Sequence, residues 1–382
     1  MTQTVTPYHV SGDIDYERLL DEFGADRLSD RQQTRLGHPL ARRDVFYAGR
    51  SVDRFLDADR RSVVTGRGPS GPMHLGHVLP FYFAKHLQDA FDATVYVPLS
   101  DDEKYYAKDQ TYPETRNYLR DNLRDVLAVG FDPEKTRIVV DTDDADVVYP
   151  VASAFAGDIT HSQMTATYGD PPNVGLAFYP AVQTAHLLLP QLVHGEHATL
   201  VPIAVDQDPH VRVSRDVAAK AKYDVSKPGA LLGKFLPSLD GPGKMSSSEG
   251  VAIHLDDDPE TVREKISSHA YTGGRATVAE HREKGGIPEE DVPFQYLQAF
   301  FESDDDRLRD VEAAYRSGEL LSGELKELAA EKIAAFLREH QSRKANLGSL
   351  ADELAPYRLT ADERERARSA VGLSRGSGGL NA

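Results

Sequence analysis

Short apolar segments alternate with longer amphipathic segments through much of this chain of 382 residues, and this alternation most restricts its fold. The apolar segments have the length and content of buried parallel strands, and the amphipathic ones have the spacing of covering helices. A doubly wound α/β sheet requires alternation of this kind, and we predict that fold class. The predicted strands are Ser62–Thr65, Ala93–Leu99, Thr136–Val140 and Thr199–Val205, and the predicted helices are His77–Ala90, Pro113–Val129, Ala145–Ala156 and Pro180–Leu192.

The strand pattern stops near Asp291, after which apolar residues recur every three or four positions, as in helices. The predicted helices of this part are Phe294–Glu302, Asp304–Ser317 and Ser322–His340. We therefore predict an N-terminal extension at 1–60 with a helix at Tyr16–Phe23, a Rossmann-like α/β domain at 61–286, an all-α domain at 287–371, and a flexible tail at 372–382.

The composition excludes several kinds of protein. The chain contains no Cys, which rules out disulfides, thiolate zinc sites and a Cys nucleophile. No apolar run approaches the roughly 20 residues of a membrane span, and the N-terminus lacks a signal-peptide core. We therefore expect a cytoplasmic protein without a membrane partner.

The charge is strongly acidic, with 61 acidic and 44 basic residues and a net charge of −17. The 38 Asp exceed the 23 Glu, and the 30 Arg exceed the 14 Lys. An excess of Asp and a shortage of Lys resemble proteins of salt-accumulating halophiles, in which molar salt screens surface repulsion within about 3 Å. The alternative is an ordinary acidic enzyme. In both cases the acidic surface argues against non-specific DNA binding, but it does not exclude one local basic site for RNA.

A Gly-rich turn follows the first predicted strand and opens the first predicted helix, with a signature at residues 69–77. Glycines there let a ligand approach the backbone, and a helix start offers free N–H groups to a phosphate. His74 and His77, three residues apart, can donate hydrogen bonds to the same phosphate group. A Gly-rich turn alone is weak evidence for nucleotide binding, but His-x-Gly-His in this position is much stronger.

A second signature, Lys-Met-Ser-Ser-Ser at 244–248, lies on a loop flanked by glycines. A Lys followed by hydroxyl groups on such a loop can close over a triphosphate and supply positive charge as pyrophosphate leaves. Alone, such a segment is a low-complexity run about as often as it is a functional motif. Its place several strands after His-x-Gly-His makes coincidence a poor explanation.

These two signatures resemble the His-Ile-Gly-His and Lys-Met-Ser-Lys-Ser motifs of class I aminoacyl-tRNA synthetases. The chain is most similar to the archaeal and eukaryotic branch of the tryptophanyl-tRNA synthetases, from about Ile14 to Ser349. The resemblance implies ATP with Mg²⁺, L-tryptophan and tRNA(Trp) as partners, a homodimer, no structural metal, and an anticodon-binding helical domain. Other family-like stretches are Asp101–Lys104, Pro180–Gln183, Ala204–Pro209, Ser214–Val217, Tyr271–Arg275, Glu280–Arg282 and Leu321–Lys326.

The resemblance also assigns roles to single residues. The catalytic residues are His74, His77 and Lys244, which stabilise the transition state and hold the phosphates. The other ATP-binding residues are Arg67, Gly68, Gly76, Lys104, Met245, Ser246, Ser247 and Ser248. The amino-acid-binding positions are Glu103, Gln183, Gln207, Val64 and Pro98. From spacing alone, Asp101–Lys104 is a solvated charge run. For Gln183, a position at the edge of the core is as good an explanation as a ligand contact.

The chain departs from the family at three positions. Ser247 replaces the second Lys of the signature, as in the close relatives. More serious are Val64 and Pro98, where the family places a Tyr and a Gln that hydrogen-bond the indole N–H. Val has no donor or acceptor, and Pro lacks even its backbone N–H. A buried indole N–H without a partner costs roughly 1–3 kcal/mol, so another group accepts it or the amino acid is selected differently.

The best local basic patch for RNA is at 337–346, with Arg338, Arg343 and Lys344 as predicted tRNA-binding residues. The alternative is a salt-bridged surface helix. Phe178, Tyr179 and Leu187–Leu189 are assigned to the core rather than to an aromatic clamp around a ligand. The remaining histidines, His161, His186 and His210 among them, lack metal-ligand spacing.

The predicted reaction joins an amino-acid carboxylate to the α-phosphate of ATP and then transfers the acyl group to tRNA. A tyrosyl-tRNA synthetase shares this fold and is the nearest alternative. A small nucleotidyltransferase also uses His-x-Gly-His, but lacks a long helical C-terminal domain. A paralogue that binds tRNA or ATP without charging is a further alternative, motivated by Val64 and Pro98.

Overall fold

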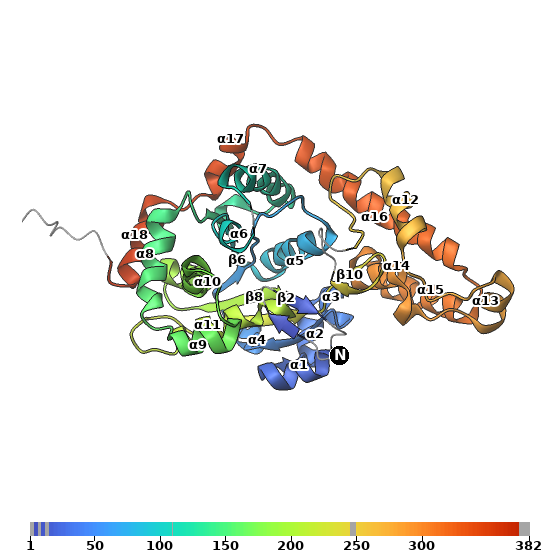
Figure 1. The fold of residues 1–382 in the computed structure, drawn as a ribbon, viewed down its shortest axis with the longest axis horizontal. Helices are drawn as coiled ribbons and strands as arrows, with labels where there is room; N and C mark the ends of the chain where they lie inside the picture. Colours follow the sequence, from blue (N-terminus) through green and yellow to red (C-terminus); the bar gives the residue numbers. More distant parts are fainter. Residues whose placement is uncertain (1–3, 7–8, 12–14, 109, 245–249, 374–382) are drawn as a thin grey trace, which may run out of the picture.

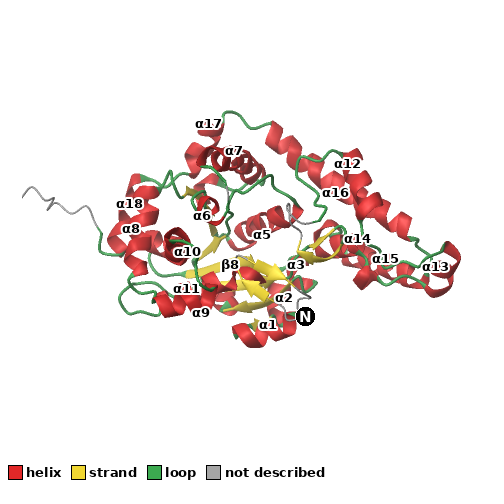
Figure 2. Ribbon diagram, viewed as in Figure 1, coloured by secondary structure: helices red, strands yellow, loops and turns green. Residues whose placement is uncertain are grey.

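The computed structural model describes residues 4–6, 9–11, 15–108, 110–244 and 250–373 (Figure 1). Figure 2 shows a central sheet with helices on both faces and a helical lobe beside it, which confirms the predicted α/β class with C-terminal helices. Within the described residues, no helix is long and apolar enough to cross a membrane.

The central sheet has seven strands in the order β3-β4-β9-β8-β5-β6-β7. The last five in this order are parallel, whereas β4 is antiparallel to β9 and β3 is antiparallel to β4. Two small hairpins, β1 with β2 and β10 with β11, stand apart from it. The strands are β1 (Thr4–Thr6), β2 (His9–Ser11), β3 (Asp26–Arg27), β4 (Phe46–Arg50), β5 (Arg61–Val64), β6 (Thr94–Leu99), β7 (Thr136–Val140), β8 (Ala198–Ala204), β9 (Gly229–Gly233), β10 (Pro237–Ser238) and β11 (Gly241–Lys244).

All four predicted strands are present, within one residue at most of their ends. The sequence patterns missed β3, β4 and β9, so part of the expected N-terminal extension completes the sheet. β9 is Gly-Ala-Leu-Leu-Gly, and its two glycines shorten the apolar signal. A Cβ on Gly229 would lie 2.8 Å from the carbonyl oxygen of Arg50, so close strand packing requires glycine there.

The predicted helices are also present, with bounds that differ by several residues in places. The described α-helices are α1 (Tyr16–Phe23), α2 (Asp30–Leu36), α3 (Pro39–Arg42), α4 (Val52–Asp57), α5 (Leu75–Phe91), α6 (Glu103–Ala107), α7 (Tyr112–Ala128), α8 (Ala145–Ala156), α9 (His161–Tyr168), α10 (Val174–His194), α11 (Asp208–Ala218), α12 (Pro259–His269), α13 (Val278–Lys284), α14 (Val292–Tyr296), α15 (Asp305–Ser317), α16 (Ser322–Ala345), α17 (Leu350–Leu354) and α18 (Ala361–Ala370). A π-helical turn, Leu297–Phe301, extends α14.

The sheet separates two apolar cores. Adjacent residues of one strand serve opposite faces, so Val63 belongs to the core with α5, α7 and α16, and Val64 to the core with α8, α10 and α11. β5 pairs with β6 on one side and with β8 on the other. The chain order reverses between β5 and β8, and in open α/β sheets ligands bind at this point, beyond the carboxyl ends of the strands.

The C-terminal helices form a lobe that runs from α12 to α16 at the right of Figure 1. α12, on the N-terminal side of residue 287, packs along α16, and α16 also packs on α7. The chain then passes through α17 and returns to the opposite side, where α18 packs on α8 and α10. The proposed domain limits stay predictions, and most of the expected tail lies outside the described residues.

Candidate active site

The loop after β5 places two histidines at the start of α5. His74 occupies the N-cap in an extended conformation, and its backbone N–H donates to Nδ1 of His77 at 3.4 Å. The two rings stack with their centroids 3.5 Å apart. The backbone N–H of Leu75 donates to the carbonyl of Ile253 at 3.1 Å, which ties this turn to the segment after the second signature. The turn therefore presents paired imidazoles at a helix N-terminus, where an anion is favoured.

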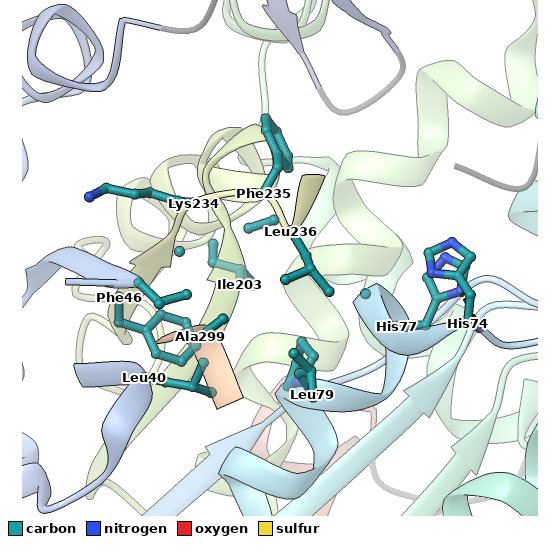
Figure 3. A pocket seen from close by; sticks show the side chains of 15 residues that line it. Leu40, Phe46, His74, His77, Leu79, Ile203, Lys234, Phe235, Leu236 and Ala299 are labelled. Atoms are coloured by element: carbon teal, nitrogen blue, oxygen red, sulfur yellow. Dashed lines mark hydrogen bonds between the residues drawn. The ribbon is translucent and has the colours of Figure 1, made fainter. Parts of the chain in front are cut away.

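A largely apolar pocket of about 680 Å³ opens beside His74 and His77 (Figure 3). Gly76 lies at its rim, between the two histidines in sequence. Figure 3 shows aliphatic and aromatic side chains facing the space on the other sides. An apolar slot next to phosphate-binding groups suits the flat ring of a nucleotide base. These walls are formed by Leu40, Phe46, Leu79, Ile203, Leu236 and Ala299.

The second signature begins next to this pocket. β10 starts at Pro237, directly after the pocket residue Leu236. β11 pairs antiparallel with β10, and its last residue, Lys244, lies opposite Pro237. The backbone of Lys244 is thus held on the same side of the molecule as the two histidines. The predicted phosphate-binding residues Met245, Ser246, Ser247 and Ser248 lie outside the described residues.

A second, more polar cleft of about 770 Å³ adjoins the first, and Ile203 lines both. It lies at the carboxyl ends of β5, β6 and β8, where the chain order reverses. The cleft brings together all five predicted amino-acid-binding residues and three of the predicted ATP-binding residues. These are Val64, Pro98, Glu103, Gln183 and Gln207, with Arg67, Gly68 and Lys104.

Glu103 and Lys104 form an ion pair within the cleft, with Oε2 and Nζ 2.5 Å apart. Glu103 is buried, so this segment is not the solvated charge run that spacing alone allowed. Gly68 faces the pair closely, because a Cβ there would lie 2.4 Å from Cε of Lys104 and 2.9 Å from Oε2 of Glu103. Glycine at this position leaves both charges within reach of a ligand.

Arg67 brings a further positive charge to the cleft. Its backbone N–H donates to the carbonyl of Pro98, and its Nη2 donates to the carbonyl of Gly71 at 3.1 Å. Nε and Nη1 are buried and have no hydrogen-bond partner among the described residues. Burial lowers the pKa of this guanidinium to about 10, and Asp125 opposes the effect. A buried cation with unused donors is suited to bind an anion.

Gln183 and Tyr179 approach the cleft from α10. Nε2 of Gln183 donates to the hydroxyl of Tyr179 at 2.5 Å. The sequence patterns assigned Tyr179 and Leu187 to the core, and both are buried, yet both also line the cleft. Successive turns of one apolar helix point these residues toward the same sheet end as Gln183. The periodicity of apolar residues identifies the buried face of the helix, but it does not show that part of this face borders a cavity.

A cluster of buried acids supports the segment that holds Glu103. Nε2 of His186 lies 2.6 Å from Oδ1 of Asp141, and the hydroxyl of Tyr149 donates to Asp102 at 3.2 Å. Burial, followed by the charge of Asp141, raises the pKa of Asp102 to about 8. Burial likewise raises the pKa of Asp141 and lowers that of His186 to about 4. A carboxyl group whose pKa is raised by burial therefore lies directly before the ion pair of the cleft.

Comparison with known proteins identifies the family of this chain. The model of the family "tRNA synthetases class I (W and Y)" matches residues 57–338. Tryptophan–tRNA ligase 2 of Halobacterium salinarum is 70% identical over 371 residues, 97% of this chain and 98% of that protein. The tryptophan–tRNA ligase of Saccharolobus solfataricus is 42% identical over 356 residues, 89% of this chain and 92% of that protein. The chain belongs to the tryptophan–tRNA ligase family.

Solved structures agree with this membership. The tryptophanyl-tRNA synthetase of Aeropyrum pernix has a TM-score of 0.79 at 31% identity, covering 93% of this chain and 96% of that chain. The enzyme from Encephalitozoon cuniculi, solved bound to tryptophan, has a TM-score of 0.81 at 30% identity, covering 91% and 98%. The resemblance to the archaeal and eukaryotic branch is thus confirmed, fold included.

Two cleft residues, Val64 and Pro98, differ from the residues that we expect at these positions in the family. Val64 and Pro98 both line the cleft and present only hydrocarbon side chains to it. The carbonyl of Pro98 accepts the backbone N–H of Arg67 at 3.0 Å. The cleft of this family member therefore lacks a polar side chain at both positions.

The three predicted tRNA-binding residues differ in their surroundings. Arg338 is exposed on α16. Arg343 donates through Nε to the carbonyl of Ala128 at 2.7 Å and through Nη2 to the hydroxyl of Tyr82 at 2.5 Å. Nζ of Lys344 lies within 3.0 Å of the carboxylates of Asp121, Asp125 and Asp256. Arg343 and Lys344 thus hold α16 to its neighbours, and Arg338 is the residue of the three that is open to a partner.

Proposed function

We propose that the protein activates L-tryptophan with ATP and transfers it to tRNA(Trp). The observation that supports this best is the junction of the two pockets at Ile203. One pocket holds the paired histidines and suits a nucleotide, and the other holds a buried carboxylate and cations that suit an amino acid. An α-phosphate at the junction is within reach of an amino-acid carboxylate.

The first step requires little proton transfer, because the carboxylate of the amino acid is already a nucleophile. One of its oxygens bonds to the α-phosphorus of ATP, and the bond from that phosphorus to the bridging oxygen of pyrophosphate breaks. Positioning and charge stabilisation supply the catalysis. In this proposal, His74 and His77 donate to the phosphate oxygens, and Lys244 with the following serines neutralises the departing pyrophosphate.

The amino acid is held by charge. Glu103, Gln183 and Gln207 hold the ammonium and carboxylate groups of the amino acid in this proposal, and Arg67 and Lys104, which line the same cleft, bind the triphosphate. Mg²⁺ accompanies the ATP phosphates. In the second step, a ribose hydroxyl of the terminal adenosine of tRNA attacks the acyl carbonyl carbon, the bond from that carbon to the phosphate oxygen breaks, and AMP leaves while the hydroxyl proton passes to solvent. Exposed Arg338 contacts RNA phosphate. A homodimer in the cytoplasm is the expected form.

ATP–pyrophosphate exchange with each of the twenty amino acids tests this function. We expect exchange with tryptophan, and stronger exchange in molar KCl than at low salt, since salt screens the net charge of −17. Exchange with tyrosine instead would favour a tyrosyl-tRNA synthetase. Exchange with no amino acid, from a folded protein that still binds ATP, would favour a paralogue that does not charge tRNA.

A further inference from the structure

Tryptophan in this cleft needs a partner for its indole N–H, and this inference rests on the proposed function. The indole nitrogen is a donor only, so the protein must offer an acceptor. Val64 and Pro98 offer no acceptor through their side chains. Without a partner, a buried indole N–H lowers affinity about ten- to a hundredfold. The acceptor is to be sought among the other groups that line the cleft.

Four polar side chains of the cleft are already engaged or have the wrong polarity, and Thr65, Ser100 and Gln207 line it as well. Arg67 and Lys104 are donors only. Glu103 lies in its ion pair with Lys104, and the hydroxyl of Tyr179 accepts from Gln183. These groups serve the charged end of the amino acid or one another.

His210 is the remaining aromatic acceptor in the wall of the cleft. It lies in the first turn of α11 and is 5% exposed. Its Nδ1 lies 3.0 Å from the hydroxyl of Tyr168, and its ring meets that of Tyr179 edge-on with centroids 6.1 Å apart. Because Tyr168 engages Nδ1, Nε2 is the ring nitrogen left to meet a ligand.

The surroundings also keep this imidazole neutral. Burial, with the nearby charges of His186 and Lys104, lowers the pKa of His210 to about 3. A neutral imidazole has one donor and one acceptor nitrogen, whereas a protonated one has two donors. If the Nδ1 proton is donated to Tyr168, the lone pair is on Nε2.

We propose that Nε2 of His210 accepts the indole N–H of tryptophan and that the Tyr168 hydroxyl fixes the required tautomer. His210 is then a specificity-determining residue that takes over the role left open by Val64 and Pro98. Tyr168 is a positioning residue, because it acts through His210.

Exchange kinetics with two substrates test this assignment. The probe is β-(3-benzothienyl)alanine, in which sulfur replaces the indole N–H and the ring shape is kept. We expect wild-type protein to prefer tryptophan in kcat/KM. His210→Phe should lower kcat/KM for tryptophan about ten- to a hundredfold and leave the value for the sulfur analogue within about threefold, because only the N–H loses its partner. Tyr168→Phe should reduce the same preference by a smaller factor.

Two matched variants remove other oxygens from the same cleft. Tyr179→Phe and Thr65→Val should keep the preference for tryptophan over the analogue. The assignment would be overturned if either of these variants lost the preference while His210→Phe retained it. An equal fall for both substrates in His210→Phe would also overturn it. Should His210→Phe fail to fold, His210→Leu, whose side chain also has no acceptor, provides the same ratio. If the wild-type protein uses tryptophan but does not prefer it over the sulfur analogue, only this inference is wrong. If the wild-type protein is inactive with tryptophan, the proposed function is wrong.

Discussion

The nucleotide pocket and the amino-acid cleft share Ile203, yet they are built in different ways. The reactive groups of the nucleotide pocket come from one turn, where His74 and His77 cap α5. The polar groups of the amino-acid cleft come from loops and helices that are far apart in the chain. The groups proposed for the chemistry thus come from two short signatures, at the start of α5 and at the end of β11, while the groups proposed to select the amino acid are spread over many positions. Single substitutions can therefore change selection and leave the chemistry in place.

The largest expected effect is on the nucleotide side. His77→Ala removes a preorganised donor and should lower the rate of adenylate formation about 10²–10³-fold, measured by ATP–pyrophosphate exchange. Lys244→Ala should have an effect of the same size. His161→Ala, an exposed histidine at the start of α9, is the matched control and should change the rate little. Exchange within a few-fold of wild type in His77→Ala would refute the assignment.

A smaller effect is expected from the amino-acid side. Glu103→Gln keeps the size of the side chain, but removes the charge that pairs with Lys104 and that we propose binds the amino acid. Loss of a hydrogen bond to a charged group corresponds to about ten- to a hundredfold in kcat/KM for tryptophan. The KM for ATP should change much less. Equal changes in both KM values would mean that the two pockets are not separable in function.

The same contrast explains what could be predicted from the sequence. The strands β5 to β8 and the helix start at His74 depend on local patterns or on family motifs, and family motifs also selected Glu103 and Lys104 as cleft residues. Strand β9 could not be predicted from the sequence, because the glycines that permit its close packing also shorten its apolar signal. The roles of His210 and of Arg343 depend on contacts between distant elements, for which one sequence without aligned relatives gives no signal.

The pH dependence of stability reports on the buried imidazole of the amino-acid cleft. In the unfolded chain His210 takes up a proton near its ordinary pKa of 6.5, whereas burial lowers its folded pKa to about 3. Between these values the unfolded state binds more protons, so the free energy of unfolding falls as pH falls. At pH 5 this amounts to about 2 kcal/mol.

His210→Gln removes that titration. Urea unfolding of wild type and variant, at pH 8 and pH 5 in the same KCl, should show the stability difference shift by about 2 kcal/mol in favour of the variant at pH 5. The other buried histidines titrate in both proteins and cancel in this comparison. A difference independent of pH would mean that the pKa of His210 is the same in the folded and the unfolded protein, so that burial does not keep this imidazole neutral at pH 5.

The smallest effect is expected for a residue outside both pockets. Its substitution tests whether amino-acid activation is independent of the surface that contacts RNA. Arg338→Ala removes one exposed charge on α16 and should raise the KM for tRNA about threefold, as expected for one phosphate contact. Pyrophosphate exchange should not change, since Arg338 lines neither pocket. Arg343→Ala provides the contrast: it cuts the bonds to Ala128 and Tyr82 and should lower the melting temperature, which Arg338→Ala should leave unchanged. If Arg338→Ala slows exchange as well, α16 communicates with the nucleotide side through α5 and α7, and the separation of chemistry from recognition is incomplete.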